Sequence, residues 1–431
     1  MVHCILAAFA MTVLPLLRPS LPVVLLASLL AGCAGASLLQ ADPPAAAVDV
    51  PAAWQAAAPS PGAPPSAQLQ AQWWQRFDDP RLPEVIQQAL EANTDIRSAQ
   101  AAQADERAAA ATLAQTRVSL AAEVAVSYIG LRGLQARLAL ARQTLTSQDE
   151  TLQTVRWKQQ AGLASDLDVA QALTAAEQTR AQIPALEGSL AQSANSLAVL
   201  TGQPPGRLAD LLQQPRPVPQ ARGELTLAIP ARTLRQRPDV QASEQQVSAA
   251  LARAAQAQAQ RYPSFAISGS LGRQALTLAA LGGGPATLSH ALVASVSWPL
   301  WDGGAARAQA EAQQAALDSA RSSYQAAVLA ALNDVENALL ALDYDRRQVE
   351  RLLAAVTAAT QAEALGRQRY QSGLIDLPTL LTLQRTLLSA RDSAVSAQAT
   401  LSADHVRLYK ALGGGWQPEP EADSAPPAAR S

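Results

Sequence analysis

Apolar residues recur at helical spacing along two long stretches of the chain, residues 95–160 and residues 302–371. Neither stretch contains proline, and glycine is sparse in both. A helix rises about 1.5 Å per residue, so about 60 such residues extend on the order of 90 Å. Spacings of three, four and seven residues predict an apolar seam between packed long helices. The spacing is shown by Leu131, Leu134, Leu138 and Leu145 in the first stretch and by Val328, Leu332, Val335 and Leu339 in the second.

Two shorter segments alternate with period two instead. In residues 264–271, Phe265, Ile267 and Leu271 alternate with small or polar residues, and residues 290–301 alternate in the same way. One apolar face and one small or polar face over about ten residues is typical of a strand in a membrane β-barrel. A Gly-Gly-Gly-Pro sequence between the two segments favours a loop. A small soluble hairpin is the alternative interpretation.

Regularly spaced glycines relate the two halves of the chain. Gly162 and Gly373 are each followed by leucine and lie 211 residues apart, and the same offset relates Gly202 to Gly413. Glycine tolerates the left-handed conformation that ends a helix, so each Gly-Leu pair predicts a tight turn between two helices. We therefore expect an internal duplication of a long-helix hairpin.

The two copies differ in length near their start. Asp95 and Asp239 match at an offset of 144 residues, so the second copy holds 67 residues that the first lacks. Both strand-like segments fall in this additional part. The expected fold is therefore mainly α with a small β part, and the strand pair of the first repeat is missing.

Composition and charge narrow the range of possible functions. Apolar residues make up 49% of the chain but aromatic residues only 4%, which suits alanine- and leucine-rich helices. A net charge of −2 gives no reason to expect nucleic acid as a partner. Cys4 and Cys33 both lie near the start, and the histidines lack metal-ligand spacing. With no Ser-His-Asp arrangement and no phosphate-binding loop, we expect a non-enzymatic protein that needs no cofactor.

The first 33 residues have the features of an export signal. An apolar run at residues 21–30 follows a basic residue and is too short for a comfortable membrane span, and Met11 is an alternative start. The sequence Leu-Ala-Gly-Cys at residues 30–33 resembles the bacterial lipobox, which implies cleavage before Cys33 and covalent lipid on that residue. Several buried acyl chains would make a stable anchor. An ordinary signal peptide with an incidental cysteine is the alternative.

These features divide the chain into five parts. They are a lipoprotein signal peptide (1–32), a lipidated Pro/Ala-rich tether (33–70), a shortened first repeat (71–222), a second repeat with two strands (223–416) and a disordered tail (417–431).

Short motifs along the mature chain occur in a characteristic order. They are Trp73-Trp74 with Phe77, Asp79-Pro80 and Leu82; Asn93 with Asp95-Ile96-Arg97; Arg237-Pro238-Asp239-Val240 with Glu244; Tyr262-Pro263-Ser264; residues 298–304; and residues 409–416. In this order, and with the duplication, they resemble the TolC-like outer-membrane efflux proteins, specifically their NodT-like lipoprotein branch.

The resemblance implies a homotrimer in the outer membrane, with one shared β-barrel and a long helical tube in the periplasm. It places both helix turns at the periplasmic tips, where they meet a membrane-fusion adaptor and help gate the pore. The resemblance also implies an inner-membrane RND-type pump as the source of energy. The tip residues carried over are Gly162, Leu163, Ser165, Gly373, Leu374 and Asp376. A ring of three Asp376 side chains would favour cations, and the alternative role of Asp376 is to cap a helix.

The missing strand pair is a departure from the family, which has four strands per chain. Six strands per trimer fall below the usual minimum of about eight.

Export of small molecules such as drugs is the expected function. The alternatives are a type I secretion channel and a periplasmic coiled-coil lipoprotein without a pore.

Overall fold

The computed structural model describes residues 72–92, 96, 108–208, 215–222, 234–235, 237–274, 287–298 and 301–414. Cys33, the signal peptide, the tether and the tail lie outside these residues. Two compact units are present: one takes in residues 243–326, and the other takes in the described residues before 243 and after 326. The boundaries of the five sequence-based parts stay predictions.

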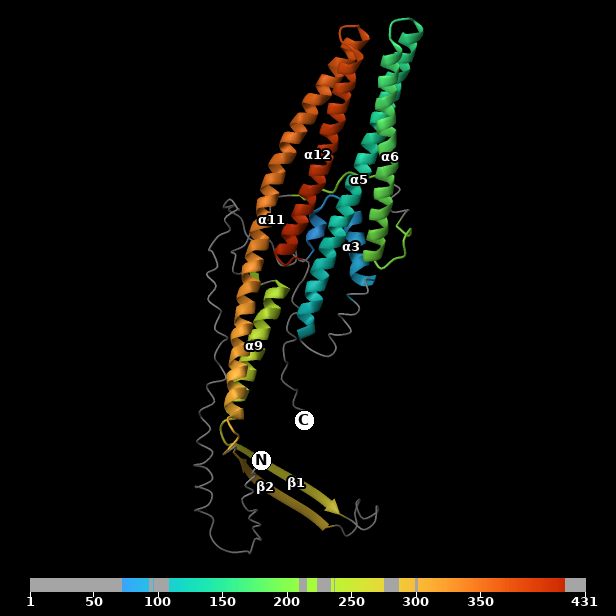
Figure 1. Cartoon of the computed structure of the whole chain (residues 1–431). Helices are drawn as coiled ribbons and strands as arrows, with labels where there is room; N and C mark the ends of the chain where they lie inside the picture. The colour runs from blue at the N-terminus through green and yellow to red at the C-terminus, as the bar shows by residue number, and fades with distance from the viewer. Residues whose placement is uncertain are drawn as a thin grey trace, which may run out of the picture. The chain divides into compact units, whose positions relative to one another are not determined.

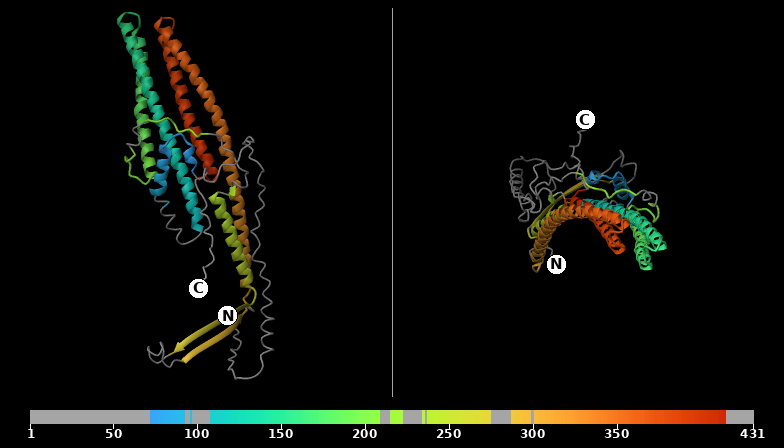
Figure 2. Two further views of the ribbon diagram at one scale, coloured as in Figure 1. Left: turned by 180° about the vertical axis from the view of Figure 1, so that it is seen from behind. Right: turned by 90° about the horizontal axis from the view of Figure 1, so that it is seen from above.

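The larger unit is built on two helical hairpins. The first consists of α5 (Ala108–Gln160) and α6 (Asp166–Leu200), and the second of the end of α11 (Ala305–Gln371) and α12 (Leu377–Ala411). Helix α5 packs against both α6 and α12. Figures 1 and 2 show the hairpins side by side, with both tight turns at the same end of the unit. The predicted long-helix, duplicated fold is confirmed.

The predicted apolar seams are largely buried. Leu131 and Leu138 of α5, and Val328, Val335 and Leu339 of α11, are all less than a tenth exposed. The remaining seam positions, Leu134, Leu145 and Leu332, are half-buried. Burying a leucine contributes on the order of 2 kcal/mol, so these positions hold the hairpins together.

The duplication extends to the far ends of the hairpins. Gly202 and Gly413 have φ values of 67° and 75°, and each lies against the chain that begins its own repeat. A Cβ on Gly202 would stand 2.6 Å from the carbonyl oxygen of Ala92, and one on Gly413 would stand 3.2 Å from the Cα of Arg237. In both repeats, the glycine after the second helix of the hairpin therefore allows a close approach to the chain that begins the repeat.

The first repeat lacks the strand pair in the part of it that the structure describes. Its described residues form helices, turns and one isolated bridge between Phe77 and Ala221. Helix α5 begins at Ala108, within the stretch where the second repeat carries its additional residues.

The N-terminal motif fastens the start of the described chain to two helices. Trp73, in η3 (Trp73–Arg76), is fully buried and stacks on Tyr409 of α12, with the ring centroids 5.3 Å apart. Asp79 precedes α3 (Arg81–Ala92) and accepts a hydrogen bond from the Tyr128 hydroxyl of α5 at 2.8 Å. The fully buried Arg132 donates to the same hydroxyl. The residues of this motif therefore attach the start of the described chain to α5 and α12.

The smaller unit joins a helix pair to a strand pair. Val247, Ala250 and Ala254 of α9 (Pro238–Ala259) pack on Leu317 of α11.

Strands β1 (Ser264–Gln274) and β2 (Thr287–Ser297) form a two-stranded antiparallel sheet. Ile267 pairs with Ala294, and Gly269 pairs with Leu292, so the apolar positions of both strands share one face. Ile267 and Leu292 are 77% and 80% exposed, and this apolar face is therefore uncovered within a single chain.

Candidate functional site: the paired helix turns

The first predicted tip is a tight turn from α5 into α6. Gly162 has a φ of 74°, a left-handed conformation that costs a residue with a side chain about 1 kcal/mol or more. The Gly162 N–H donates to the carbonyl of Gln159 at 2.9 Å, and the Leu163 N–H donates to the carbonyl of Lys158 at 2.7 Å. This pair of bonds satisfies the last carbonyls of α5 and ends the helix.

The second tip repeats this geometry between α11 and α12. Gly373 has a φ of 73°, and its N–H donates to the carbonyl of Tyr370 at 3.1 Å. The Leu374 N–H donates to the carbonyl of Arg369 at 2.9 Å. The two turns that the Gly-Leu pairs predicted are therefore confirmed, down to the same pattern of backbone bonds.

A polar side chain starts the helix after each turn. The Ser165 hydroxyl accepts from the Asp168 N–H at 3.2 Å, and the Asp168 carboxylate accepts from the Ser165 N–H at 2.8 Å, which makes a capping box. Asp376 accepts from the Thr379 N–H at 3.1 Å. Hydrogen bonds from Thr379 hold the pKa of Asp376 below its ordinary value. Asp376 is thus a helix cap, and the ring of three Asp376 side chains stays a prediction.

Large apolar side chains stand exposed at the turns. Leu163 and Leu374 are 77% and 74% exposed. Trp157 and Leu167, on the two helices of the first tip, are exposed as well. Exposed apolar side chains that gather at the turns favour contact with another protein. The sequence motifs pointed to the leucines of the turns but not to Leu167.

Beneath the turns, one apolar cluster joins the two hairpins. Its members come from all four helices and are largely buried: Leu152, Val155, Ala172, Tyr370, Leu377, Leu380 and Leu381. The two tips are therefore parts of one packed body.

Polar links cross between the hairpins beside this cluster. The Lys158 ammonium donates to the carbonyl of Tyr370 at 3.2 Å and lies 3.9 Å from the centre of its ring. The Arg367 guanidinium donates to the Ser147 hydroxyl at 2.5 Å and to the Glu363 carboxylate at 2.5 Å. Burial raises the pKa of the Tyr370 hydroxyl, so this ring stays neutral. These links hold α11 against α5, and sequence reasoning missed all of them.

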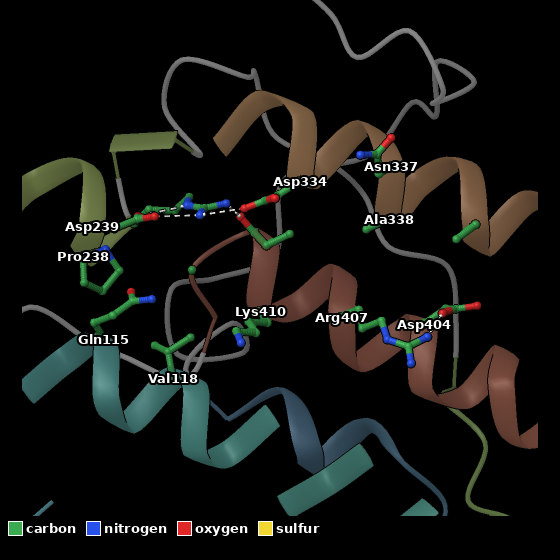
Figure 3. A pocket seen from close by; sticks show the side chains of 14 residues that line it. Gln115, Val118, Pro238, Asp239, Asp334, Asn337, Ala338, Asp404, Arg407 and Lys410 are labelled. Atoms are coloured by element: carbon green, nitrogen blue, oxygen red, sulfur yellow. Dashed lines mark hydrogen bonds and ion pairs between the residues drawn. The ribbon is translucent and has the colours of Figure 1, made fainter. Parts of the chain in front are cut away.

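Farther along the same unit, a cavity of about 410 Å³ lies where α9 begins, and charged side chains are part of its lining (Figure 3). Arg237 donates to Asp239 at 2.7 and 3.0 Å, to Asp334 of α11 at 3.0 Å, and to the carbonyl of Ala411 at the end of α12 at 3.0 Å. Burial raises the pKa of Asp239, but the hydrogen bonds from Arg237 outweigh it and hold the pKa below its ordinary value. Arg237 therefore fastens three helices at one point.

Among the helices within the described ranges, none combines the length and the apolar character needed to cross a membrane.

Comparison with known proteins identifies the fold and the family. The family described as "Outer membrane efflux protein" matches residues 86–203 and 229–414. Nodulation protein T of Rhizobium leguminosarum biovar viciae is 33% identical over 327 residues, which are 74% of this chain and 66% of that protein. Outer membrane protein OprJ of Pseudomonas aeruginosa is 30% identical over 300 residues, 70% of this chain and 62% of OprJ. The chain spans slightly less than two thirds of the length of these relatives.

Solved structures of outer-membrane channels share the architecture. The channel OprN superposes with a TM-score of 0.72 at 29% identity, over 81% of this chain and 93% of OprN. The MtrE channel of Neisseria gonorrhoeae has the same fold, with a TM-score of 0.72 at 24% identity over 85% of this chain and 96% of MtrE. The duplicated hairpins, the paired turns and these similarities lead to one conclusion: the chain belongs to the outer membrane efflux protein family.

Proposed function

We propose that the chain is the outer-membrane channel subunit of a tripartite efflux system that exports small molecules. One observation carries the proposal more than any other. Two duplicated hairpins place turns of identical geometry at the same end of one packed body, and each turn exposes a leucine. Exposed leucines at one end of a packed unit favour contact with another protein. Membership of the efflux protein family suggests which kind of protein that partner is.

Three copies of the chain would form the working unit, and their turns would meet a periplasmic membrane-fusion adaptor. Gly162, Leu163 and Ser165 of one turn, with their counterparts Gly373, Leu374 and Asp376, would form the contact. Energy would come from an inner-membrane RND-type pump, since the channel itself carries out no catalysis and needs no cofactor.

The names of relatives indicate the class of substrate. Similar proteins include the pyoverdine export protein OpmQ of Pseudomonas aeruginosa and the toluene efflux protein TtgF of Pseudomonas putida. They are 33% and 31% identical to this chain. Their substrates are chemically unrelated small molecules, which supports small-molecule export here and leaves the choice of substrate to the pump.

The membrane end of the subunit would consist of β1, β2 and a lipid anchor. The exposed apolar face that Ile267 and Leu292 share suits contact with lipid. Acylation of Cys33 would add several buried chains and hold the subunit at the outer membrane.

The test is complementation of a strain from which this gene has been deleted. The unmodified gene should lower accumulation of a fluorescent efflux substrate, and Leu163→Asp should reduce that rescue because a charge at the turn disrupts an apolar contact. If neither gene changes accumulation although the protein is made, the proposed export function is wrong.

Acylation is tested separately with radioactive palmitate. Cys33→Ser should lose the label, and Cys4→Ser, which changes the other cysteine, should keep it. Label that persists on the Cys33→Ser protein would refute the lipid site.

A further inference from the structure

A cavity of about 190 Å³ lies between the two hairpins of the larger unit, lined by side chains of α5, α11 and α12. Three polar members of this lining are buried: Gln148 of α5, Glu363 of α11 and Gln384 of α12 are 3%, 8% and 5% exposed. Among the described residues, the side-chain oxygens of Gln148 and Gln384 have no hydrogen-bond partner. A buried acceptor without a donor is costly, so these two oxygens call for an explanation.

The orientation of the Gln384 amide follows from its neighbour on α5. The Gln384 Nε2 donates to the hydroxyl oxygen of Thr151 at 3.1 Å. Thr151 cannot donate in return, because the single hydrogen of its hydroxyl is donated to the carbonyl of Ser147 at 2.9 Å. Exchanging the oxygen and nitrogen of the Gln384 amide would therefore place two acceptors against each other. The Gln384 oxygen is thus the atom that needs a donor.

Direct contacts between α5 and α12 lie on either side of this cavity. On the side of the turns, Leu152 of α5 and Leu381 of α12 belong to one apolar cluster. On the other side, Arg137 of α5 donates to both carboxylate oxygens of Asp392 on α12, at 2.6 and 3.1 Å. The cavity therefore interrupts the direct contact between the two hairpins.

The duplicated hairpin does not itself require these polar side chains. At the offset of 211 residues that relates the two repeats, Gln148, Glu363 and Gln384 correspond to apolar residues, which are Ala359, Leu152 and Leu173. The same positions of the hairpin therefore carry a polar set in one place and an apolar set in the other. What the cavity holds explains the polar set better than the hairpin fold does.

The charges of the lining narrow the class of ligand. Glu363 is paired with Arg367 of the same helix at 2.5 Å, and Arg391 of α12 lines the cavity as well. Two positive charges against one negative charge disfavour a metal ion or an ammonium group. Water is neutral, donates to amide oxygens and accepts from arginine, and at about 30 Å³ per molecule several waters fit into the cavity.

We propose that this cavity is a specific water-binding site, in which bound water donates to the oxygens of Gln148 and Gln384 and bridges α5 to α12. The site is a hydrated level between an apolar cluster and an ion pair, so the two hairpins are held together there through water. It depends on packing within one chain and holds whether or not the chain exports anything.

The test is X-ray radiolytic labelling of the full-length, detergent-solubilised protein. Hydroxyl radicals that form from bound water label the side chains beside it, and mass spectrometry locates the label. Leu387 and Leu388, which line the cavity and are half-buried, are the reporters. Leu380 of the apolar cluster, 1% exposed, is the internal reference. Both reporters should be labelled several-fold faster than Leu380.

Variants separate bound water from bulk solvent and from a donor within the chain. Gln148→Leu combined with Gln384→Leu removes both acceptors, so labelling of the reporters should fall several-fold while the melting temperature stays equal or rises. Gln384→Leu alone should lower the labelling in part, which provides a second test if the double variant does not fold. Gln361→Leu, at an exposed glutamine of α11, is the matched control and should leave the labelling unchanged. Arg391→Met should leave both the labelling and the melting temperature nearly unchanged.

Three results would overturn the proposal. Reporters labelled no faster than Leu380 in the unmodified protein would show that the cavity holds no water. Labelling that survives in the glutamine variants would show that the two amides do not hold it. A large loss of melting temperature in Arg391→Met would show that the arginine, and not water, serves the two oxygens.

Discussion

Removing the guanidinium of Arg237 should loosen the end of α12. In the larger unit, this side chain is 10% exposed and is bonded to Asp239, Asp334 and the carbonyl of Ala411. The substitution Arg237→Ala leaves the Ala411 carbonyl without its donor and frees both carboxylates. The amides that report the effect are those of the last turn of α12, including Leu412, which donates to the carbonyl of Leu408.

The size of the effect follows from how exposed each partner is. Asp334 is 53% exposed and Asp239 is 35% exposed, so water compensates for most of what these two lose, and each pair is worth about 0.5 kcal/mol. The bond to the buried end of α12 adds about 1 kcal/mol. Together they predict a loss of about 2 kcal/mol in the local opening free energy, or about 30-fold faster hydrogen exchange.

Hydrogen exchange followed by mass spectrometry on the full-length protein measures this directly. Arg237→Lys should give a smaller increase than Arg237→Ala, because lysine keeps the positive charge, although it cannot reproduce the two-pronged contact of the guanidinium with Asp239. Arg307→Ala is the matched control, since Arg307 is 76% exposed and pairs with Glu311 within its own helix. Exchange at the end of α12 that is unchanged in Arg237→Ala, or equally fast in Arg307→Ala, would refute the reasoning.

Three further predictions concern the turns. Gly373→Ala should cost about 1 kcal/mol because its φ is 73°, whereas Gly188→Ala inside the exposed face of α6 should stabilise slightly; thermal melting followed by circular dichroism separates them. Leu163→Asp should abolish cross-linking to the adaptor, while Val199→Asp, 64% exposed at the other end of α6, should not; equal losses would argue against a contact at the turn. Asp376→Asn should preserve the fold, since asparagine caps helices as well as aspartate, and should lower cation selectivity only if three Asp376 side chains form a ring.

The parts of the fold that the sequence predicted are those governed by local rules. A glycine followed by leucine at the end of a long apolar repeat marks a left-handed helix end, and both Gly162 and Gly373 have that conformation. Alternation predicted the two strands as well. Their register was not predictable from either strand alone, because it depends on which residues pair, such as Ile267 with Ala294.

The contacts between the hairpins could not be predicted, because their partners are far apart in the sequence. Lys158 and Tyr370 are 212 residues apart, and Arg367 and Ser147 are 220 residues apart. In isolation, each of these residues fits the solvated face of a helix. Asp404 likewise has the sequence context of a surface acid, although the tertiary fold leaves it only 2% exposed. Tertiary contact, and not local pattern, decides these roles.

Current through single reconstituted channels would probe the function of the assembled protein most directly. If the proposed channel function is right, we predict that purified, lipidated trimers in a planar bilayer give discrete and reproducible current steps, because the proposed trimer would enclose a continuous passage. Trimers that form but pass no current would contradict this account, and would favour a coiled-coil lipoprotein without a pore.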